Sequence, residues 1–401
     1  MRNQSVDILI IGGGLIGAAL LLSLKELGYS ALLVESKSFK ETISPDFDAR
    51  SLALSPASVR ILSTLGLWDH LKEHATFIEM IHVSAQHHFG ATRLQGDAQN
   101  PLGYVIEMHH INHALHQMLN TQQLLAPASL ISLNKEQQEA TIQSVNGKIK
   151  IKAQLIVAAD GAESTVRQLC KIPVKIKYYN QQAIVANVAL ARAHQNKAFE
   201  RFTTHGPLAL LPMQDKKMSL VWALPPEQCN DLLALNDNEF LKKLQNEFGY
   251  RLGRMTKIGK RVSFPLKQVI TKELTQWPLV FVGNAAQTLH PVAAHGFNLG
   301  LRDVATLAQC IAELGLQQTM LQRYLHLRRP DQRLITKGTD GLIGLFTSRL
   351  PGIGLMRNLG LIALDNSPLL KELLARYAKG FGGVVPDLVC ELPLNTKEEN
   401  S

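Results

Sequence analysis

The stretch VDILIIGGGLIGAALLLSLKELGYSALLVE, residues 6–35, decides how the chain begins to fold. It predicts a short buried strand over residues 6–11, then a glycine turn, then a helix from Leu15 to about Leu27. A second strand follows over residues 31–34, and Glu35 comes directly after it. This order of strand, glycine turn, helix, strand and acid is typical of a parallel βαβ unit.

The glycines of this turn have the spacing GxGxxG, and each has its own task. Gly12 permits the tight turn, Gly14 lets the backbone approach a pyrophosphate, and Gly17 lets the helix lie close to the strand. The first turn of the helix offers unpaired N–H groups to that pyrophosphate. Glu35, 18 residues after Gly17, is placed to accept hydrogen bonds from ribose hydroxyls. The unit predicts one bound dinucleotide, NAD or FAD, because no second GxGxxG occurs in the 401 residues.

Composition and charge restrict the possible classes of protein. Apolar residues make up 46% of the chain and charged residues 19%, which excludes a disordered or fibrous protein. The net charge is +9, and such a surplus attracts anions in general. The basic residues are scattered rather than gathered with aromatic residues, so we expect no nucleic acid as a partner.

Cysteine spacing and the absence of a leader pattern predict a cytoplasmic protein. Cys170, Cys229, Cys310 and Cys390 have neither CxxC nor metal-ligand spacing, which indicates reduced thiols. The apolar stretch Ile8–Leu24 is short for a membrane span and lacks a basic region before it, and its glycines fit the dinucleotide turn better.

The chain is expected to leave its dinucleotide-binding domain and return to it. Alternating and aromatic runs with Gly and Pro breaks over 176–274 predict a mainly antiparallel sheet with a helix at Asp237–Phe248. A buried strand at 279–283, a loop of small residues and a helix at Phe297–Ala312 then form another strand–turn–helix. The predicted fold is α/β, a Rossmann-like domain with a parallel sheet plus a mainly antiparallel substrate domain and C-terminal helices. The expected boundaries are 1–75, 105–175 and 275–330 for the dinucleotide domain, 76–104 and 176–274 for the substrate domain, and 331–401 for the helical region.

Three separated motifs carry a resemblance to a known family. They are the glycine turn, Asp160-Gly161 within Leu155–Arg167, and the late segment Gly283–Asp303. In this order they are similar to the flavoprotein aromatic hydroxylases of the para-hydroxybenzoate hydroxylase type. The segments 48–55 and 65–68 further resemble the ubiquinone-biosynthesis hydroxylases, and the resemblance runs from residue 6 to about 380.

Within that family, one branch is most similar to this chain. Most branches have Gly-Asp-Ala-Ala-His at the late motif, whereas residues 283–287 read Gly-Asn-Ala-Ala-Gln, as in the 2-polyprenyl-6-methoxyphenol hydroxylases. Residues 199–213 and 248–253 also look like that branch. The resemblance implies an FAD-dependent monooxygenase that hydroxylates C4 of a 2-polyprenyl-6-methoxyphenol in ubiquinone biosynthesis. NAD(P)H would be the transient reductant and O2 the oxidant, through a flavin C4a-hydroperoxide.

The resemblance also implies a set of cofactor-binding residues around FAD. Some would hold the adenosine and pyrophosphate, others the ribityl chain and the isoalloxazine. The former are Gly12, Gly14, Gly17, Glu35 and Arg50, and the latter are Asp160, Asn284, Gly296, Phe297 and Asn298, with His113 where related helices carry a glutamine. The backbone N–H groups near Phe297 and Asn298 would steady the O2/N1 edge of the flavin as it becomes anionic.

Three residues are candidates for the chemistry itself. Pro291 begins the loop expected to line the isoalloxazine, and His205, in the substrate domain, is a candidate base for the phenol. The loop departs from the family pattern Pro-x-Ala-Gly-Gln-Gly at two positions. Ala294 replaces a glycine, and His295 replaces a glutamine and brings a titratable group to the ring.

We expect no metal, although His109, His110, His113 and His116 include i, i+4 spacing. No acid ligand stands at matching spacing, and a solvated helix face explains the histidines. Ser164 is predicted to cap a helix rather than act as a nucleophile.

Alternatives and partners stay open at this point. The chain is either this hydroxylase, a sibling acting at another ring carbon, a two-electron oxidoreductase or a flavoprotein scaffold. The expected partner is a prenylated phenol. The stretch from Gly341 to Arg376 is apolar with interspersed basic residues. It predicts one of two things: a surface that binds the inner face of the plasma membrane or a biosynthetic complex, or helices that pack on the FAD domain. The sequence predicts no oligomeric state.

Overall fold

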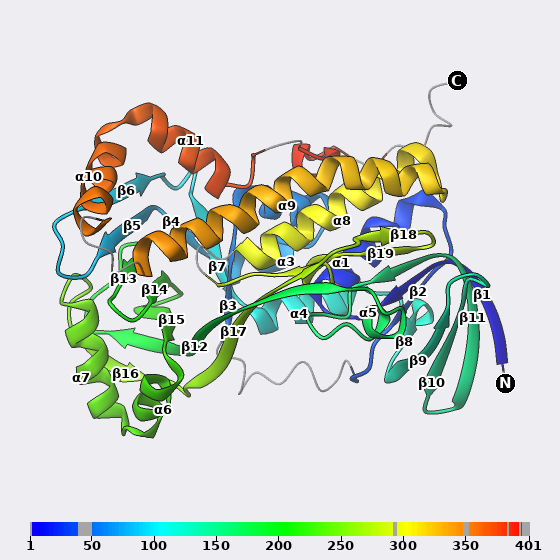
Figure 1. Cartoon of the computed structure of the whole chain (residues 1–401), viewed down its shortest axis with the longest axis horizontal. Helices are drawn as coiled ribbons and strands as arrows, with labels where there is room; N and C mark the ends of the chain where they lie inside the picture. The colour runs from blue at the N-terminus through cyan, green and yellow to red at the C-terminus, as the bar shows by residue number, and fades with distance from the viewer. Residues whose placement is uncertain are drawn as a thin grey trace.

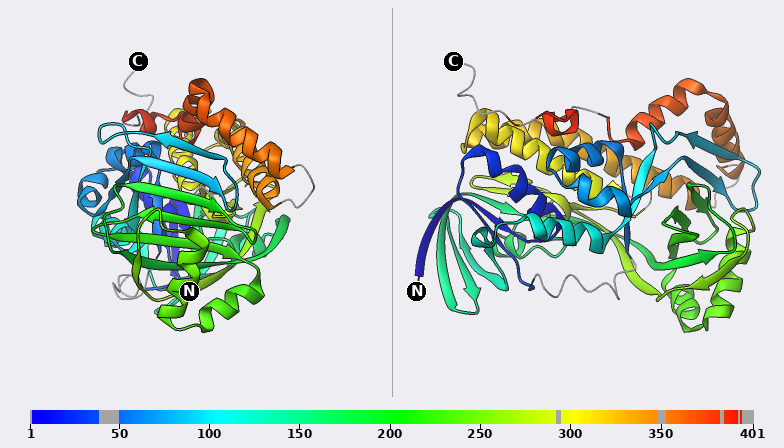
Figure 2. Two further views of the ribbon diagram at one scale, coloured as in Figure 1. Left: turned by 90° about the vertical axis from the view of Figure 1, so that its left-hand side faces the viewer. Right: turned by 180° about the vertical axis from the view of Figure 1, so that it is seen from behind.

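Two β-sheets stand at opposite ends of the molecule, and two long helices run along one side of both (Figure 1). This arrangement is seen in a computed structural model that describes residues 2–38, 50–291, 295–347, 353–382, 385–392 and 394. The opposite view in Figure 2 shows the same long helices spanning from the N-terminal sheet to the far sheet.

The first sheet has eight strands among the described residues. Their bounds are β1 (Arg2–Ile11), β2 (Ala31–Val34), β8 (Leu124–Leu125), β9 (Ala128–Asn134), β10 (Glu139–Ser144), β11 (Gly147–Ala158), β18 (Thr275–Gln276) and β19 (Leu279–Phe281). The order is β18-β19-β11-β1-β2-β8, with β1 parallel to both β2 and β11, and β9 and β10 extending β11 as an antiparallel meander. The central strands are buried on both faces, which is why their sequences are continuous apolar runs.

Helices cover this sheet and provide its core. The α-helices are α1 (Leu15–Ser23), α2 (Pro56–Thr64), α3 (Trp68–Leu71), α4 (Met108–Met118), α5 (Thr165–Leu169), α6 (Pro226–Ala234), α7 (Asp237–Phe248), α8 (His295–Leu314), α9 (Gln318–Thr347), α10 (Ile353–Asn366) and α11 (Pro368–Ala378). Short 3-10 helices lie at Lys25–Leu27, Lys72–His74, Thr121–Gln123, Gly283–Ala285 and Asp387–Cys390. Apolar side chains of α1, α2, α4, α8 and α9 meet the face of the sheet that carries Ile8, Ile10 and Val157.

The second sheet has nine strands among the described residues and is mainly antiparallel. Its strands are β5 (Met80–Ala85), β6 (Ala91–Gln95), β12 (Val174–Leu190), β13 (Lys197–Phe202), β14 (Pro207–Pro212), β15 (Lys217–Leu224), β16 (Met255–Ile258), β17 (Val262–Thr271) and β20 (Gln287–Thr288). The order is β20-β17-β12-β15-β14-β13-β5-β6, with β16 paired to β12. A small third sheet, β3 (Ser51–Leu54), β7 (Gly103–Glu107) and β4 (Thr76–Ile78), has the order β3-β7-β4.

The predicted fold class is confirmed, and several elements match the prediction closely. The strand 31–34 and the helix Asp237–Phe248 have the predicted bounds. The helix after the glycine turn ends at Ser23 and gives way to a 3-10 turn, which Gly28 closes with a φ of 73°. The predicted loop 284–296 contains β20, which pairs with β17 of the second sheet. The domain boundaries stay predictions, and α9 crosses residue 330 without interruption.

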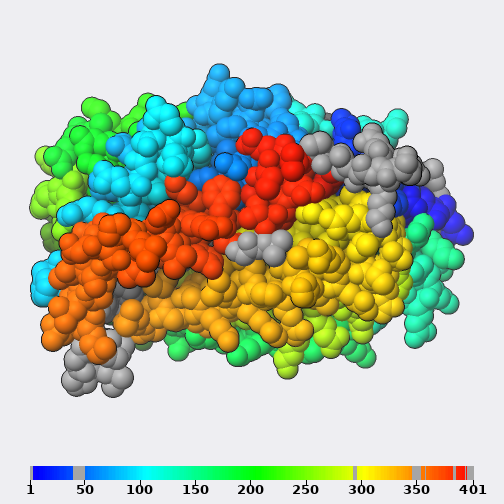
Figure 3. Space-filling model, turned by 90° about the horizontal axis from the view of Figure 1, so that it is seen from above, coloured from blue at the N-terminus to red at the C-terminus, as the bar shows by residue number. Residues whose placement is uncertain are grey.

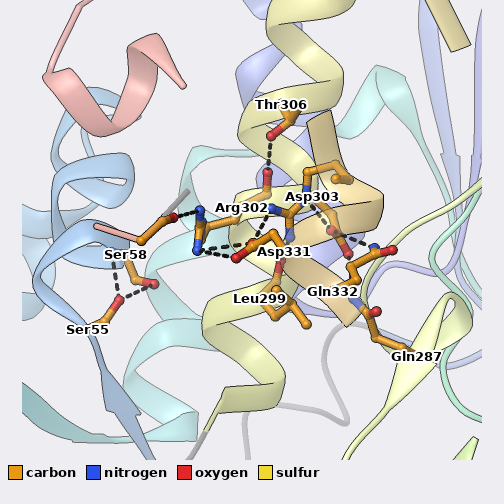
Figure 4. Close-up of polar contacts among 11 residues, drawn as sticks. Ser55, Ser58, Gln287, Leu299, Arg302, Asp303, Thr306, Asp331 and Gln332 are labelled. Atoms are coloured by element: carbon orange, nitrogen blue, oxygen red, sulfur yellow. Dashed lines mark hydrogen bonds and ion pairs between the residues drawn. The ribbon is translucent and has the colours of Figure 1, made fainter. Parts of the chain in front are cut away.

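A buried ion network joins α8 and α9 to the late motif (Figure 4). Asp303, which is fully buried, accepts from the Arg328 Nε at 2.8 Å and from the Gly283 backbone N–H at 3.1 Å. Arg328 Nη1 also donates to Asp331 at 2.6 Å, and Asp331 lies 3.0 Å from Arg302 Nη1. Burial raises the pKa of Asp303, and the Arg328 guanidinium opposes that rise.

Removing one cation from this network should lower the free energy of unfolding far more than removing a surface charge does. We expect Arg328→Met to destabilise the protein by about 3–5 kcal/mol, because Asp303 and Asp331 would keep buried charges without their partner. The control is Lys150→Met, which breaks the partly exposed pair Lys150–Glu139. It should destabilise the protein by under about 1 kcal/mol. Urea denaturation followed by circular dichroism measures both. Equal midpoints for the two variants would contradict a structural role for the network.

Candidate active site

The glycine turn is held tightly against the end of β11. Gly12 has a φ of 107°, and a Cβ there would lie 2.5 Å from the carbonyl oxygen of Ala159. A Cβ on Gly17 would lie only 1.9 Å from the Gly12 carbonyl oxygen. No side chain fits at either position, so these two glycines are needed for the backbone itself to close.

Gly14 differs from its two neighbours in the motif, because space is open around it. It precedes α1 with extended backbone angles, and a Cβ on it would meet no described heavy atom within 4 Å. The first N–H groups of α1 point toward this space without partners in the helix. An anionic group is attracted to such a helix end, so the geometry fits the predicted pyrophosphate.

Glu35 braces the turn. Its Oε2 accepts the Gly13 backbone N–H at 2.7 Å, and its Oε1 accepts the Lys37 N–H at 2.9 Å. A carboxylate oxygen has two acceptor sites, so these bonds leave capacity for ribose hydroxyls. The sequence predicted the ribose contact, which stays a prediction, and missed the link to Gly13.

Asp160 brings the second motif into contact with the first. A Cβ on Gly12 would lie 2.7 Å from the Cα of Asp160, so the two loops touch. Asp160 Oδ2 accepts from the Val166 N–H at 3.1 Å, whereas its Oδ1 is buried with no hydrogen-bond partner among the described residues. Burial raises the pKa of this carboxyl. An acceptor left in this state fits a donor supplied by a bound cofactor.

Ser164 caps the short helix α5, as predicted. Its Oγ accepts the Arg167 backbone N–H at 3.1 Å. The Arg167 side chain then reaches the carbonyl oxygen of Ala285 in the late motif at 3.0 Å. The second and third motifs are thus joined by one guanidinium.

The late motif also packs directly against the first. Cβ atoms on Gly283 and Gly300 would lie 3.0 and 2.7 Å from side-chain carbons of Ile16 on α1. Asn284 next to Gly283 is exposed, with no neighbouring side chain bonded to its amide in the described structure, so it is available to a ligand. The three motifs predicted from the sequence therefore meet at one place.

Asn298 has a structural contact that the sequence did not indicate. Its Oδ1 accepts from the Ser55 N–H at 2.8 Å and the Ser58 hydroxyl at 2.7 Å, and its Nδ2 donates to Ala53 at 2.8 Å. The side chain thus fixes the start of α8 to β3 and α2. Phe297 is half-buried beside it and packs against the core of the first sheet.

Some predicted site residues lie in the rim of this region or outside what the structure describes. Arg50 is exposed, and its carbonyl accepts the Met108 N–H at 3.1 Å. His113 is exposed on α4 with its Nε2 2.9 Å from Gln117. Pro291 is half-buried, and Gly296 lies in the first turn of α8, where a Cβ would meet no described heavy atom within 4 Å. Ala294 and the side chain of His295 lie outside the described residues, so the predictions for them stand as they are.

His205 lies in the turn between β13 and β14. Its Nδ1 is 3.1 Å from Gln228 on α6, and its carbonyl accepts from Gln181 at 2.8 Å. None of its described contacts is with the three motifs. Its role as a base stays a prediction that these contacts do not strengthen.

The late motif reaches the second sheet through His290, a contact the sequence did not predict. His290 is buried and lies edge-on to Tyr179 of β12, with ring centroids 4.9 Å apart. Burial lowers the pKa of His290 to about 4, with the Asp340 charge opposing, so the imidazole is neutral at physiological pH. Tyr179 in turn donates to Asp340 of α9 at 2.5 Å.

The histidines of α4 are closer to an acid than the sequence suggested. Glu107 Oε2 lies 3.8 Å from His109 Nδ1 and 3.9 Å from His110 Nε2. The sequence indicated no acid ligand at matching spacing, whereas the structure brings Glu107, the residue before α4, within ligand-group distance of both imidazoles. The rings of His110 and His74 stack at 3.8 Å. Burial lowers the pKa of His110 to about 4.

Comparison with known proteins identifies the family of the chain. The profile of a family described as "FAD binding domain" matches residues 5–339. The ubiquinone hydroxylase UbiL of Rhodospirillum rubrum is 35% identical, over 98% of this chain and 94% of that protein. The 3-demethoxyubiquinol 3-hydroxylase of Escherichia coli is 33% identical, over 95% of this chain and all of that protein. Human ubiquinone biosynthesis monooxygenase COQ6 is 26% identical, over 93% and 92%.

Solved structures show the same fold at low sequence identity. The p-nitrophenol 4-monooxygenase PnpA of Pseudomonas putida superposes with a TM-score of 0.77 at 16% identity, covering 96% of this chain and 99% of that one. The chain belongs to the FAD binding domain family, and it is an FAD-dependent monooxygenase. More narrowly, it is a member of the ubiquinone-biosynthesis hydroxylase family.

The two kinds of glycine in the turn should respond differently to substitution. We expect Gly14→Val to weaken FAD binding at least about 100-fold with little change in the melting temperature of the FAD-free protein, because the side chain occupies only the space in front of α1. Gly17→Ala should instead lower that melting temperature, because its Cβ collides with the backbone of Gly12. Fluorescence titration with FAD and thermal denaturation measure the two effects.

Gly341→Ala is the control for both, since a Cβ there meets no described atom within 4 Å and the residue lies on α9 away from the turn. If Gly14→Val retained FAD as the wild type does, the assignment of this space to the pyrophosphate would be wrong.

Proposed function

We propose that the chain hydroxylates C4 of a 2-polyprenyl-6-methoxyphenol, with NAD(P)H as reductant and O2 as oxidant. The observation that carries the choice of ring carbon is the late motif Gly-Asn-Ala-Ala-Gln at residues 283–287. In the structure Gln287 is buried, and its Nε2 lies 3.4 Å from Asp303. The residue that separates the branches thus contacts the network that positions this motif.

The residues around the three motifs hold FAD and shape its surroundings. The α1 N-terminus and Gly14 would receive the pyrophosphate, and the Oδ1 of Asp160 would accept a hydrogen bond from the cofactor. When bound, FAD accepts a hydride from NAD(P)H and activates O2. The N–H groups that begin α8 provide a positive helix end near the late motif, where negative charge is favoured.

A hydroxylase acting at another ring carbon is the second candidate. It is favoured by the similarity to the E. coli relative, whose name specifies 3-hydroxylation of demethoxyubiquinol. A two-electron oxidoreductase and a scaffold are further alternatives, and each differs from the hydroxylase in its product.

Genetic complementation distinguishes the ring positions. We expect the gene to restore ubiquinone in a strain that lacks the C4 hydroxylase, and not in strains that lack the C5 or C6 hydroxylase. The reason is the late motif of the C4 branch. Mass spectrometry of lipid extracts is the measurement, with Gly14→Val as the inactive control. Persistent 2-polyprenyl-6-methoxyphenol in the first strain, with rescue of another, would assign the chain to a sibling branch.

We further propose that the enzyme meets this substrate at the inner face of the plasma membrane, through α10 and α11. No helix among the described residues combines the length and apolar character needed to span a bilayer. The face seen in Figure 3 carries α9, α10 and α11 side by side. Large apolar side chains of α10 and α11 are strongly exposed on the molecular surface: Leu355, Met356, Leu359, Leu369, Leu370, Leu373, Leu374 and Tyr377.

The spacing of these residues makes a stripe on each helix. On α11 Leu369, Leu373 and Tyr377 are four residues apart, with Leu370 and Leu374 beside them, and no residue of α11 is buried. An amphipathic helix that lies in the surface of a bilayer has this pattern. Apolar side chains this exposed on consecutive helices indicate a surface that is covered in use.

The charges nearby favour an anionic lipid surface as the occupant. Arg329, Arg333 and Lys337 of α9 and Arg376 of α11 are exposed and have no ionic partner among the described residues. Of the acids on α10 and α11, Asp365 is paired with Lys371 at 2.8 Å, and Glu372 is exposed, so the basic residues remain in excess. Each basic residue close to an anionic bilayer contributes about 1 kcal/mol of attraction.

Vesicle binding tests this surface. We expect the protein to sediment with vesicles of phosphatidylglycerol and phosphatidylethanolamine, and Leu369→Gln with Leu373→Gln to weaken that binding at least about tenfold, since each leucine loses about 1.5 kcal/mol or more of burial. The control replaces two other exposed apolar residues with glutamine, Ile131 of β9 and Val145 in the turn between β10 and β11. Equal binding by both double variants contradicts the proposal. Loss of a dimer in solution by the α11 variant would show a protein interface instead.

A further inference from the structure

The two faces of the second sheet differ in what covers them. One face carries Ile184, Phe199, Leu210 and Trp222, which pack against α6 and α7 as a closed core. The other face carries the alternate residues of the same strands. At its centre the register places Glu200 of β13 opposite Ala209 of β14 and Val83 of β5.

The centre of this second face is apolar but incompletely covered. Val83, Val185, Ala209 and Val221 are small or β-branched, and each is only half-buried, as is Glu200. On the same face Ala198 and Phe202, at the two ends of β13, are instead buried. We call these five residues the central patch.

Packed clusters bound the central patch on three sides. Val105 of β7 packs in one cluster with Ala198, next to Glu200 on the same face. Leu361 of α10 packs with Phe202 in a second. In the third, Ala183 and Ala223 meet the ring of Tyr179, which carries the contact to His290 of the late motif.

Glu200 is the one ionisable residue of the central patch. Among the described residues its carboxyl has no hydrogen-bond or ion-pair partner, although carboxylates enclosed by apolar groups are ordinarily paired. Burial is the cause that raises its pKa to about 7. The Glu200 carboxyl is thus surrounded by protein while the residue remains partly accessible. A side chain in this state is a candidate for binding a ligand.

On this side of the sheet α10 brings the carboxylate of Asp365 close to Thr92, which the register places opposite Val83. This carboxylate is paired with Lys371 at 2.8 Å and accepts the Arg93 backbone N–H at 2.9 Å. The same face of β5 and β14 carries Ile81, Val83, Ala209 and Leu211, and α10 contributes Leu361. Titratable groups on the other boundaries are Glu107 beside Asn187, and His290 and Tyr179 beside Asp340. His82, Arg201, Glu247 and Arg251 belong to the opposite face, where they contact one another.

We propose that Glu200 is the substrate-binding base: its carboxylate accepts the hydroxyl of the phenol that lies on the central patch and removes its proton before the ring is hydroxylated. This rests on the proposed function. The phenolic O–H bond breaks, its proton goes to an Oε of Glu200, and the electron pair stays on the phenolic oxygen. The step consumes no oxidant or reductant. A phenolate is the more electron-rich ring, and the apolar neighbours of Glu200 offer contact to the ring and the start of the prenyl chain.

The position of Glu200 distinguishes it from the base suggested by the sequence. His205 lies five residues further along and contacts Gln228 on α6. Glu200 is on the strand, so its direction is fixed by the sheet register, and it shares its face with the cluster that meets the late motif.

The test uses the full-length FAD-loaded enzyme and 2-methoxy-6-prenylphenol, a short-chain substrate. A base must be ionised, so hydroxylation by the wild type should rise with pH through about 7 and level above it. Glu200→Gln should lose this inflection and fall at least about 100-fold at pH 8, with FAD still bound. Glu200→Asp, which keeps a carboxyl, should restore the inflection in part. Glu247→Gln, on the opposite face, is the matched control and should keep the wild-type profile.

Calorimetry with the same phenol separates failure of this proposal from failure of the proposed function. If the wild type binds the phenol but hydroxylates no ring carbon, the function is wrong. Glu200 is then supported by a proton exchange on phenol binding that depends on pH near 7 and is absent in Glu200→Gln. A Glu200→Gln enzyme with the wild-type pH profile and a rate within about twofold, or with unchanged proton exchange, overturns the assignment.

Discussion

The buried carboxylate of Asp303 is the contact on which the arrangement of the site depends. It accepts the N–H of Gly283 at the start of the late motif, and it pairs with Arg328 on α9. A buried ion pair often adds little net stability against an apolar replacement, but it discriminates strongly against structures in which one partner is misplaced. Here that discrimination fixes the relative position of α8, α9 and the late motif. Because the late motif also packs on Ile16 and contacts Tyr179, one network sets the relation between the first sheet and the second.

The first βαβ unit could be read from the sequence because its determinants are local. The apolar run of β1, the positions of Gly12 and Gly17 and the strand 31–34 are all decided by neighbours within a few turns of chain. The same holds for α7, whose N-cap Asn236 and apolar spacing lie within the helix and its flanks. The three motifs were found for a related reason, since close backbone approach permits only glycine at several of their positions.

The rest of the site depends on contacts between distant residues, and no local pattern reveals them. Asp303 stood in a quoted motif, but its partner Arg328 is 25 residues away on another helix. Glu107 reaches His109 and His110 because β7 turns directly into α4. The face that Glu200 occupies depends on strand parity across β5, β13 and β14, and a shift of one residue in register would turn the carboxyl into the core beneath α6 and α7. Composition alone could have indicated only that an acid interrupts an apolar strand.

The two sheets differ in the polar groups that each leaves available for a ligand. At the edge of the first sheet, backbone N–H groups of α1, the buried Oδ1 of Asp160 and the exposed amide of Asn284 offer many directional contacts, which suits a large, polar cofactor held in one orientation. The central patch of the second sheet offers one carboxyl among small apolar side chains, which suits an aromatic ring with a single hydroxyl and a hydrocarbon substituent. A second acid there would disfavour the phenolate form of the proposed substrate, and any second ionisable group would require a partner of its own. For the proposed prenylated phenol, selectivity would therefore depend on Glu200 together with the small apolar side chains around it.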